Sequence, residues 1–422
     1  MEKVSLIGIK KQDKKIYYNF EISDGLKNYF SGKPFIIEYT ENVEQVPEGV
    51  LAIPFVCNVL PIIWMTKSKL ELNELDEEFF KCIEEVKKGY EKVFPGVNFG
   101  GCVEPVNVVN YSYENTDKCA MFYSGGLDSV QTFVSHIKER PDLISIWGSD
   151  IKFDNKKGWD TLHNVIGSTA KKYGLKDVVI HSSFREFDNE GVLHREFFNI
   201  LQDGWWHGIK HSLGLLGHVA PYVWLNKIST MYIASTYWDD GTIIKCASSP
   251  YTDNYVKFCG CKVVHDGFEF NRQDKVTNVV NYVKSTGDQV EVHVCWETQT
   301  GGNCCECEKC YRTMAGLWAE GEDPANYGFE RASETLKKMK KNLFKKEFNL
   351  ESVSTFGPII QKRANQNLDL IKTKPYFRKF KWVLNFDFEK AVKKRRNSLK
   401  RAKWSPCRIV RAIKRRLLKK KK

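Results

Sequence analysis

The sequence predicts an α/β fold built on a doubly wound parallel sheet, with an N-terminal α+β domain and a C-terminal basic helical tail. From about residue 116 to residue 330, short apolar segments alternate with stretches of helical periodicity, as in a parallel sheet covered on both faces. Strand-like runs dominate before residue 116, and a lysine-rich helical pattern follows residue 330. We therefore expect three regions: 1–115, 116–330 and 331–422.

The N-terminal region has the pattern of a small α+β domain. Strand-like runs lie at 4–9, 15–20, 34–39 and 50–55. A helix is expected over 76–93, because Phe79, Ile83, Val86 and Tyr90 recur on one apolar face. Pro95-Gly96 ends it.

The central region alternates strands and helices. Strands are expected at 120–123, 143–147, 178–180 and 231–235, and helices at about 127–139, 159–173 and 204–225. Ligands of such sheets bind at the carboxyl ends of the strands. Three of these ends are followed by Ser124, by Trp147–Asp150 and by Ser235–Asp240.

The net charge of +13 belongs to the tail alone. Residues 376–422 hold 20 Lys and Arg against 2 acidic residues, so the rest of the chain has 45 basic and 50 acidic residues and carries about −5. After Ser405-Pro406, an amphipathic basic helix is expected, with Ile409, Val410, Ile413 and Leu417 on one face. Its apolar stripe and Trp404 favour an anionic membrane surface over RNA as the partner.

The segment Ser124-Gly125-Gly126-Leu127-Asp128-Ser129 is the strongest functional signal. It joins a predicted strand to a predicted helix, where glycines and a helix N-terminus suit a phosphate group. Ser129 could cap the helix or donate to a phosphate oxygen, and Asp128 could hold Mg²⁺. The alternative is a glycine turn without a ligand.

The cysteines Cys295, Cys304, Cys307 and Cys310 have metal-ligand spacing. The pattern C-x8-C-x2-C-x2-C supplies four thiolates, which can enclose one Zn²⁺ tetrahedrally. The 13 cysteines are not expected to form a disulfide framework.

The loop at 124–129 resembles the SGGxDS loop of the PP-loop ATP pyrophosphatases. Together with the cysteine pattern, it is similar to 7-cyano-7-deazaguanine synthase over about residues 119–314. This resemblance implies a PP-loop (HUP-like) fold, ATP bound by Ser124, Gly125, Gly126, Leu127, Asp128 and Ser129, and zinc bound by the four cysteines. It implies the reaction type but not the substrate, because the loop Ser248-Ser249-Pro250-Tyr251-Thr252-Asp253 differs from the family's substrate loop.

Other residues are weaker candidates. Trp147 and Gly148 follow a strand and could contact ATP, and Asp128, Ser129, Arg272 and Lys275 are the candidate catalytic residues. Asp239, Ser249, Pro250, Asp253 and His207 are candidates for substrate binding. His207, His211 and His218 would share one face of a regular helix, and this face could equally be a packed stripe.

We expect an enzyme that adenylates a carboxylate or a similar oxygen with ATP and Mg²⁺, releases pyrophosphate, and then lets ammonia or an amine attack. The carboxylate could belong to a small molecule or to a macromolecule. One alternative is a tRNA sulfur transferase, in which Cys305 is a spare thiol and the tail holds RNA. Another is a membrane-attached nucleotide-binding protein without catalysis.

The sequence favours a cytoplasmic location, with a peripheral place on the inner face of a membrane as an option through the tail. Residues 1–15 lack an apolar signal core. The longest apolar run, 51–65, is too short to span a bilayer.

Overall fold

The structure is a computed structural model that describes residues 1–295, 297, 302–343 and 348–403, with side chains described through residue 398. The described chain forms two compact units, which divide between Asn271 and Arg272. The basic helix predicted after Ser405 lies outside the described residues. The boundary predicted near residue 115 falls within the first unit.

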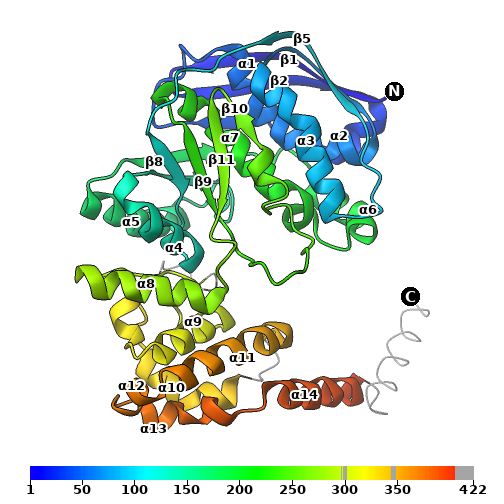
Figure 1. Ribbon diagram of the computed structural model, residues 1–422. Coiled ribbons are helices and arrows are strands. Elements are labelled where there is room, and N and C mark those ends of the chain that lie inside the picture. Colours follow the sequence, from blue (N-terminus) through cyan, green and yellow to red (C-terminus); the bar gives the residue numbers. More distant parts are fainter. Residues whose placement is uncertain (296, 298–301, 344–347, 404–422) are drawn as a thin grey trace. The chain divides into compact units, whose positions relative to one another are not determined.

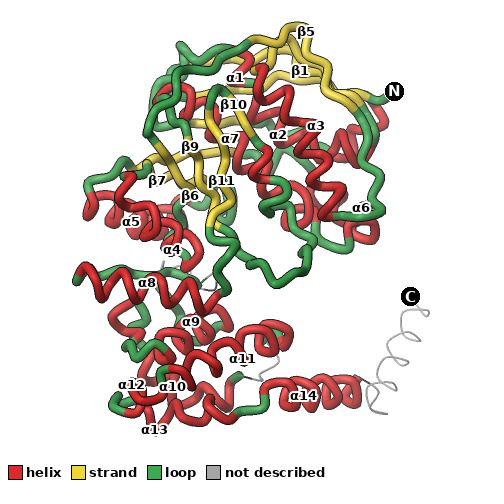
Figure 2. Tube along the Cα trace, viewed as in Figure 1, coloured by secondary structure: helices red, strands yellow, loops and turns green. Residues whose placement is uncertain are grey.

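The described part of the first unit contains one sheet of eleven strands, whose order is β10-β11-β9-β6-β7-β8-β3-β2-β1-β4-β5. The strands are β1 (Lys3–Gln12), β2 (Lys15–Ile22), β3 (Ile36–Glu38), β4 (Lys69–Asp76), β5 (Cys102–Val109), β6 (Cys119–Phe122), β7 (Asp142–Trp147), β8 (Asp177–Ser182), β9 (Thr230–Ala234), β10 (Lys257–Phe258) and β11 (Cys261–Asp266). The sheet is mostly parallel, which agrees with the predicted doubly wound α/β fold (Figures 1 and 2).

The helices of this unit are α1 (Glu48–Leu51), α2 (Ile53–Thr66), α3 (Glu77–Val93), α4 (Leu127–His136), α5 (Lys156–Tyr173), α6 (Glu190–Leu201) and α7 (His211–Asn226). A π-helical turn, Trp206–Lys210, precedes α7.

Five neighbouring parallel strands, β11-β9-β6-β7-β8, form the centre of the sheet. We number these five strands in chain order, so that β6 is 1, β7 is 2, β8 is 3, β9 is 4 and β11 is 5. From β8 to β11 across the sheet, their order is then 3-2-1-4-5. The strand order therefore reverses between β6 and β9, with α4 and α5 on one side of these strands and α7 on the other (Figure 1). Ligands of such sheets bind in the crevice outside the carboxyl ends of these two strands.

The first hundred residues extend this same sheet. β3 pairs antiparallel with β8 through Ile37 and Ser182, and β2, β1, β4 and β5 follow outward. Buried side chains from both parts, such as Val4 and Met231, belong to one hydrophobic core.

The prediction of a strand at 50–55 is wrong. These residues lie in α1 and at the start of α2, and Ile53 to Trp64 are buried throughout. A run that is apolar on all sides does not distinguish a buried strand from a buried helix. Pro54 stands in the first turn of α2, where its missing N–H costs nothing, and Pro61 is accommodated inside the helix.

Helix α3 confirms the prediction for 76–93 and packs against two loops of the central region. The buried Asp76 caps it by accepting from the N–H of Phe79 at 3.0 Å, and also accepts from the N–H of Cys259 at 3.1 Å. A Cβ at Gly89 would lie 1.9 Å from the carbonyl oxygen of Tyr251. The hydroxyl of Tyr90 donates to the carbonyl of Ile209 at 3.0 Å.

A charged cluster ties α4 to the sheet. Nε2 of His136 lies 2.9 Å from Asp266, and Nδ1 lies 2.7 Å from Glu139. Burial alone would lower the pKa of His136, but the two carboxylates outweigh it and raise the pKa to about 9. The ring is therefore an imidazolium at neutral pH.

The secondary structure described in the second unit is helical, and loops connect its helices. Its helices are α8 (Arg272–Thr286), α9 (Glu308–Ala319), α10 (Ala332–Asn342), α11 (Leu350–Gln366), α12 (Leu368–Lys372), α13 (Phe377–Phe380) and α14 (Phe388–Lys403). The buried Glu320 holds several of them together, because it accepts from Gln273 at 2.9 Å, from Arg363 at 2.7 and 3.1 Å and from Asn367 at 3.3 Å.

Candidate functional site

The loop at 124–129 joins β6 to α4 at the crevice. Gly125 has φ of +72°, a conformation that glycine adopts at no steric cost. The N-cap of α4 is Gly126, which has no side chain to occupy the first N–H groups of the helix. The hydroxyl of Ser129 donates to the carbonyl of Gly126 at 3.0 Å and accepts from the N–H of Ser124 at 3.3 Å, which closes the loop.

Two further loops follow the neighbouring strands. β6 pairs with β9 so that Met121 lies opposite Tyr232, and the same register sets Ser124 level with Ser235. Asp239 and Asp240 beyond it are exposed. The carboxylate of Asp240 accepts from the N–H of Thr242 at 3.0 Å, and the hydrogen bonds from Thr242 hold the pKa of Asp240 below its usual range.

Trp147 and Gly148, at the end of β7, already have protein partners. The ring of Trp147 stacks on His181 at 3.8 Å and on Trp159 at 5.5 Å between ring centroids. Gly148 has φ of +111°, and a Cβ there would lie 1.8 Å from the carbonyl oxygen of Ser182. Close packing against the end of β8 therefore accounts for this glycine. The role of Trp147 and Gly148 in binding ATP stays a prediction.

The loop 248–253 forms one wall of a cavity in the first unit, and its predicted substrate residues divide between the wall and the interior. Ser249 and Pro250 line the cavity. Asp253 is fully buried behind it, where its carboxylate accepts from Ser212, from Ser248 at 2.7 Å and from Thr252 at 3.1 Å, and meets Nδ1 of His265 at 2.8 Å. Asp253 thus fixes the loop to α7 and β11.

The three histidines of the 204–225 segment have different surroundings, because the π-helical turn interrupts the regular helix expected there. His218 is buried, bonded to Ser182 at 2.7 Å and to the carbonyl of Gly214, and burial lowers its pKa to about 3. Burial also lowers the pKa of His211. The side chain of His207 is 46% exposed, and its Nδ1 is paired with Asp203.

A buried ion pair anchors the turn that carries His207. Nζ of Lys210 lies 2.7 Å from Asp188 and donates to the carbonyl of Phe184 at 2.7 Å, with both charged side chains 0% exposed. Burial raises the pKa of Asp188 although Lys210 opposes this. Arg185 and Glu190 form a bidentate pair nearby, at 2.9 and 2.7 Å.

The four cysteines of the second unit converge as predicted. All four sulfur atoms lie within 4.8 Å of one another, and the pairs Cys304–Cys310 and Cys295–Cys307 are each 3.9 Å apart. A tetrahedral zinc with Zn–S bonds of about 2.3 Å requires sulfur atoms about 3.8 Å apart. The N–H of Cys307 donates to the sulfur of Cys304 at 3.1 Å, and the N–H of Cys310 to that of Cys307 at 3.5 Å. This group could hold zinc as a closed site with four ligands.

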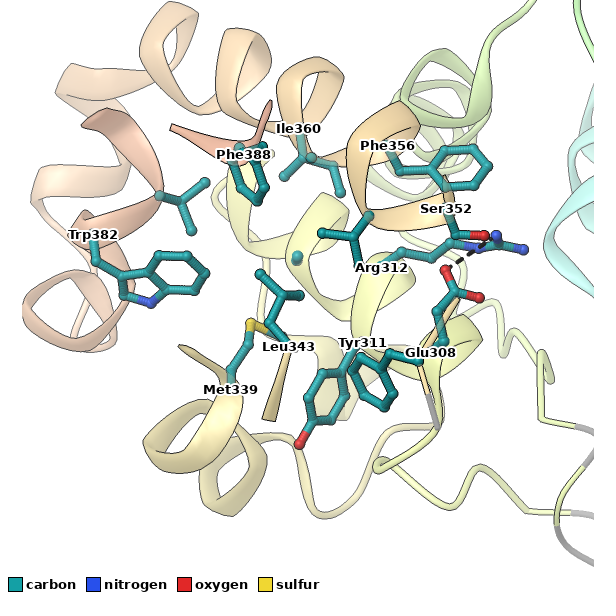
Figure 3. A pocket seen from close by; sticks show the side chains of 15 residues that line it. Glu308, Tyr311, Arg312, Met339, Leu343, Ser352, Phe356, Ile360, Trp382 and Phe388 are labelled. Carbon is teal, nitrogen blue, oxygen red and sulfur yellow. Dashed lines mark hydrogen bonds and ion pairs between the residues drawn. The ribbon is translucent and has the colours of Figure 1, made fainter. Parts of the chain in front are cut away.

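Helix α9 leads from this cysteine group to an apolar pocket within the second unit (Figure 3). Arg312 there lies over the ring of Phe356 at 4.4 Å and pairs with Glu308 at 3.3 Å. Cys305, the spare thiol of the sulfur-transfer alternative, is 1% exposed, and its carbonyl accepts from Thr335 at 2.8 Å.

The predicted site residues fall into both units. The residues from Ser124 to Asp253 belong to the first unit, whereas Arg272, Lys275 and the four cysteines belong to the second. Arg272 begins α8 and donates to Thr313 at 3.4 Å, and Lys275 is 1% exposed. Their catalytic roles stay predictions.

Two residues beside His207, Asp203 and Cys246, were not predicted from the sequence. Asp203 stands four residues before it, a spacing that places two side chains together on a helical segment. Cys246 comes from a distant loop, and no local pattern connects it with His207.

The fold and the cysteine group define an α/β protein with a site that could bind zinc. Comparison with protein-family models, with curated proteins and with solved structures gives no match. Among the described residues, the longest apolar helices are still too short to cross a membrane.

Proposed function

We propose that the protein is an ATP-dependent adenylating enzyme of the PP-loop class, which activates a carboxylate or similar oxygen for attack by ammonia or an amine. The observation that carries this proposal is the location of Ser124–Ser129 at the carboxyl end of β6, where the strand order reverses between β6 and β9. A ligand of this sheet is expected there from the topology alone.

The local structure of the loop supports a phosphate ligand in particular. The positive φ of Gly125 turns the backbone sharply, and Gly126 starts α4 without a side-chain cap. The helix N-terminus then presents N–H groups and a partial positive charge to an anion. Asp128, in the first turn of α4, is the carboxylate that would hold Mg²⁺.

In the proposed reaction, an oxygen of the acceptor attacks the α-phosphorus of ATP, and the bond to the β-phosphate oxygen breaks. The loop would hold the departing pyrophosphate, and bound Mg²⁺ would supply charge neutralisation. An amine then attacks the activated carbon, and AMP leaves with the bonding electrons. The chain contributes mainly positioning and charge stabilisation.

The zinc that the four cysteines could hold would be structural. Four thiolates fill its coordination and leave no position for a substrate. Cys305 is 1% exposed, and this burial gives no support to the sulfur-transfer alternative.

The test uses the full chain with α-labelled ATP, Mg²⁺ and a panel of carboxylates with ammonia. We expect AMP and pyrophosphate in equal amounts, and a loss of at least tenfold in rate for Asp128→Ala. The matched control is Asp160→Ala, which removes an exposed carboxylate that pairs with Lys156 on α5.

Binding is measured separately, by the shift in melting temperature with Mg²⁺ and the α,β-methylene analogue of ATP. Binding that Asp128→Ala weakens, without AMP from any carboxylate, would favour the non-catalytic nucleotide-binding protein. Absence of binding at millimolar nucleotide would reject both functions.

A further inference from the structure

Asp203 and His207 form a charge-paired unit at the entry to α7. The carboxylate of Asp203 pairs with Nδ1 of His207, so Nε2 is the nitrogen left to act on another group. Nε2 lies 3.2 Å from the hydroxyl of Tyr237, which belongs to the loop after β9.

Cys246 reaches the same place from a different part of the chain. The N–H of its neighbour Ala247 donates to the carbonyl of His207 at 2.9 Å, which holds the two segments side by side. Cys246 is 5% exposed and lines the cavity to which Tyr237, Ser248, Ser249 and His265 also contribute. The cavity is therefore lined by the thiol and by the loop predicted to bind substrate, and His207 lies behind Tyr237, a residue of the same lining.

The electrostatics agree with this geometry. Asp203 first, and the thiol of Cys246 second, raise the pKa of His207 to about 10. A histidine that is held by a carboxylate and lies beside a thiol is the arrangement that activates cysteine nucleophiles.

We propose that Cys246 is a covalent nucleophile, activated by His207, which accepts an acyl group from an electrophilic carbonyl carbon in this cavity. Asp203 is a positioning residue that acts through His207. The source of the acyl group rests on the proposed function, since an acyl adenylate is such an electrophile.

The steps balance without a further reactant. His207 holds the proton of the Cys246 thiol, and the thiolate sulfur attacks the carbonyl carbon of the acyl adenylate. The C–S bond forms, the bond from carbon to the phosphate oxygen breaks, and AMP leaves with the electron pair. The amine then attacks the thioester; the C–N bond forms, the C–S bond breaks, and the sulfur leaves as a thiolate. The proton that the amine loses passes to solvent, and the pair of thiolate and imidazolium is restored.

The experiment uses the full chain and p-nitrophenyl acetate, an activated ester that replaces the adenylate. We expect a burst of p-nitrophenolate close to one equivalent at pH 7 and an acetyl group on the peptide that contains Cys246, removable by hydroxylamine. Cys246→Ala should abolish the burst, and His207→Gln should slow it about 100-fold, as expected for loss of a catalytic base.

The control variant is Cys102→Ala, which removes a partly exposed cysteine of β5 and should leave the burst unchanged. The role of Asp203 is tested by rescue: Asp203→Ala should slow the burst and Asp203→Glu should restore most of the rate. Circular dichroism and melting temperature check that each variant is folded.

Acetylation of other cysteines at the same rate, or a burst that His207→Gln leaves unchanged, would overturn the proposal. Its failure is distinguishable from that of the proposed function. A burst on Cys246 without AMP formation from ATP would support the nucleophile and reject the adenylating function. AMP formation without a burst would support the adenylating function and reject the nucleophile.

Discussion

The buried pair of Lys210 and Asp188 gives the sharpest test of how the turn that carries His207 is held. Lys210→Met removes the positive charge but keeps most of the volume of the side chain. The carboxylate of Asp188, 0% exposed and 2.7 Å from the lost ammonium group, then has no ion-pair partner among the described residues. Breaking a buried pair in this way costs about 3–5 kcal/mol, or a factor of about 100 to several thousand in the unfolding equilibrium.

The penalty depends on pH with a definite sign. Burial already raises the pKa of Asp188 above the ordinary 3.8, and loss of Lys210 should raise it further. A carboxyl whose folded pKa is raised stabilises the folded state at low pH and loses this contribution as pH rises through the folded pKa. The difference between Lys210→Met and the wild type should therefore be larger at pH 8 than at pH 5.

The assay is urea unfolding followed by tryptophan fluorescence, with two further variants. Lys210→Met combined with Asp188→Leu removes both charges, and it should cost far less than the sum of the single changes. Lys156→Met breaks an exposed pair with Asp160 and should cost less than about 1 kcal/mol. The reasoning is refuted if Lys210→Met costs as little as Lys156→Met, or if the double variant costs as much as the sum.

Two further predictions concern zinc and pH. The purified chain should contain about one zinc ion by atomic absorption. Either Cys307→Ser or treatment with phenanthroline should remove this zinc and lower the melting temperature of the protein. The control variant Cys102→Ser should keep its zinc. A zinc content near zero in the wild type, purified without chelator, would contradict this. Protonated His136 should contribute up to roughly 3 kcal/mol to the free energy of unfolding at pH values below its unfolded pKa, which is near 6.5. This contribution should disappear as the pH rises through the folded pKa of about 9. Unfolding free energies of His136→Gln and wild type should therefore differ at pH 6 and converge at pH 10; a gap independent of pH would exclude the imidazolium.

Much of the central fold could be predicted from local patterns. The alternation of β6, α4, β7, α5, β8 and β9 follows from short apolar runs and helical periodicity, each of which is a property of a few neighbouring residues. The cysteine group was equally accessible, because its ligands lie within 16 residues of sequence.

Features that depend on distant pairing could not be predicted in this way. The attachment of β3 to β8 joins Ile37 to Ser182, and no local signal records such a partner. The π-helical turn at 206–210 changes the register of the segment with His207 and His211, which a regular period cannot anticipate. Cys246 comes close to His207 only because the loop after β9 returns to the π-helical turn, where the N–H of Ala247 donates to the carbonyl of His207.

The pairing of β3 with β8 has a consequence for any attempt to trim the protein. A chain shortened to begin near residue 116 would leave the backbone of β8 as a bare edge, open to pairing with another molecule. It would also lose the α3 surface against which Tyr251 rests at Gly89. The first hundred residues thus protect a strand from aggregation and support a wall of the cavity, so a shorter version should be sought by redesigning that edge and not by deletion.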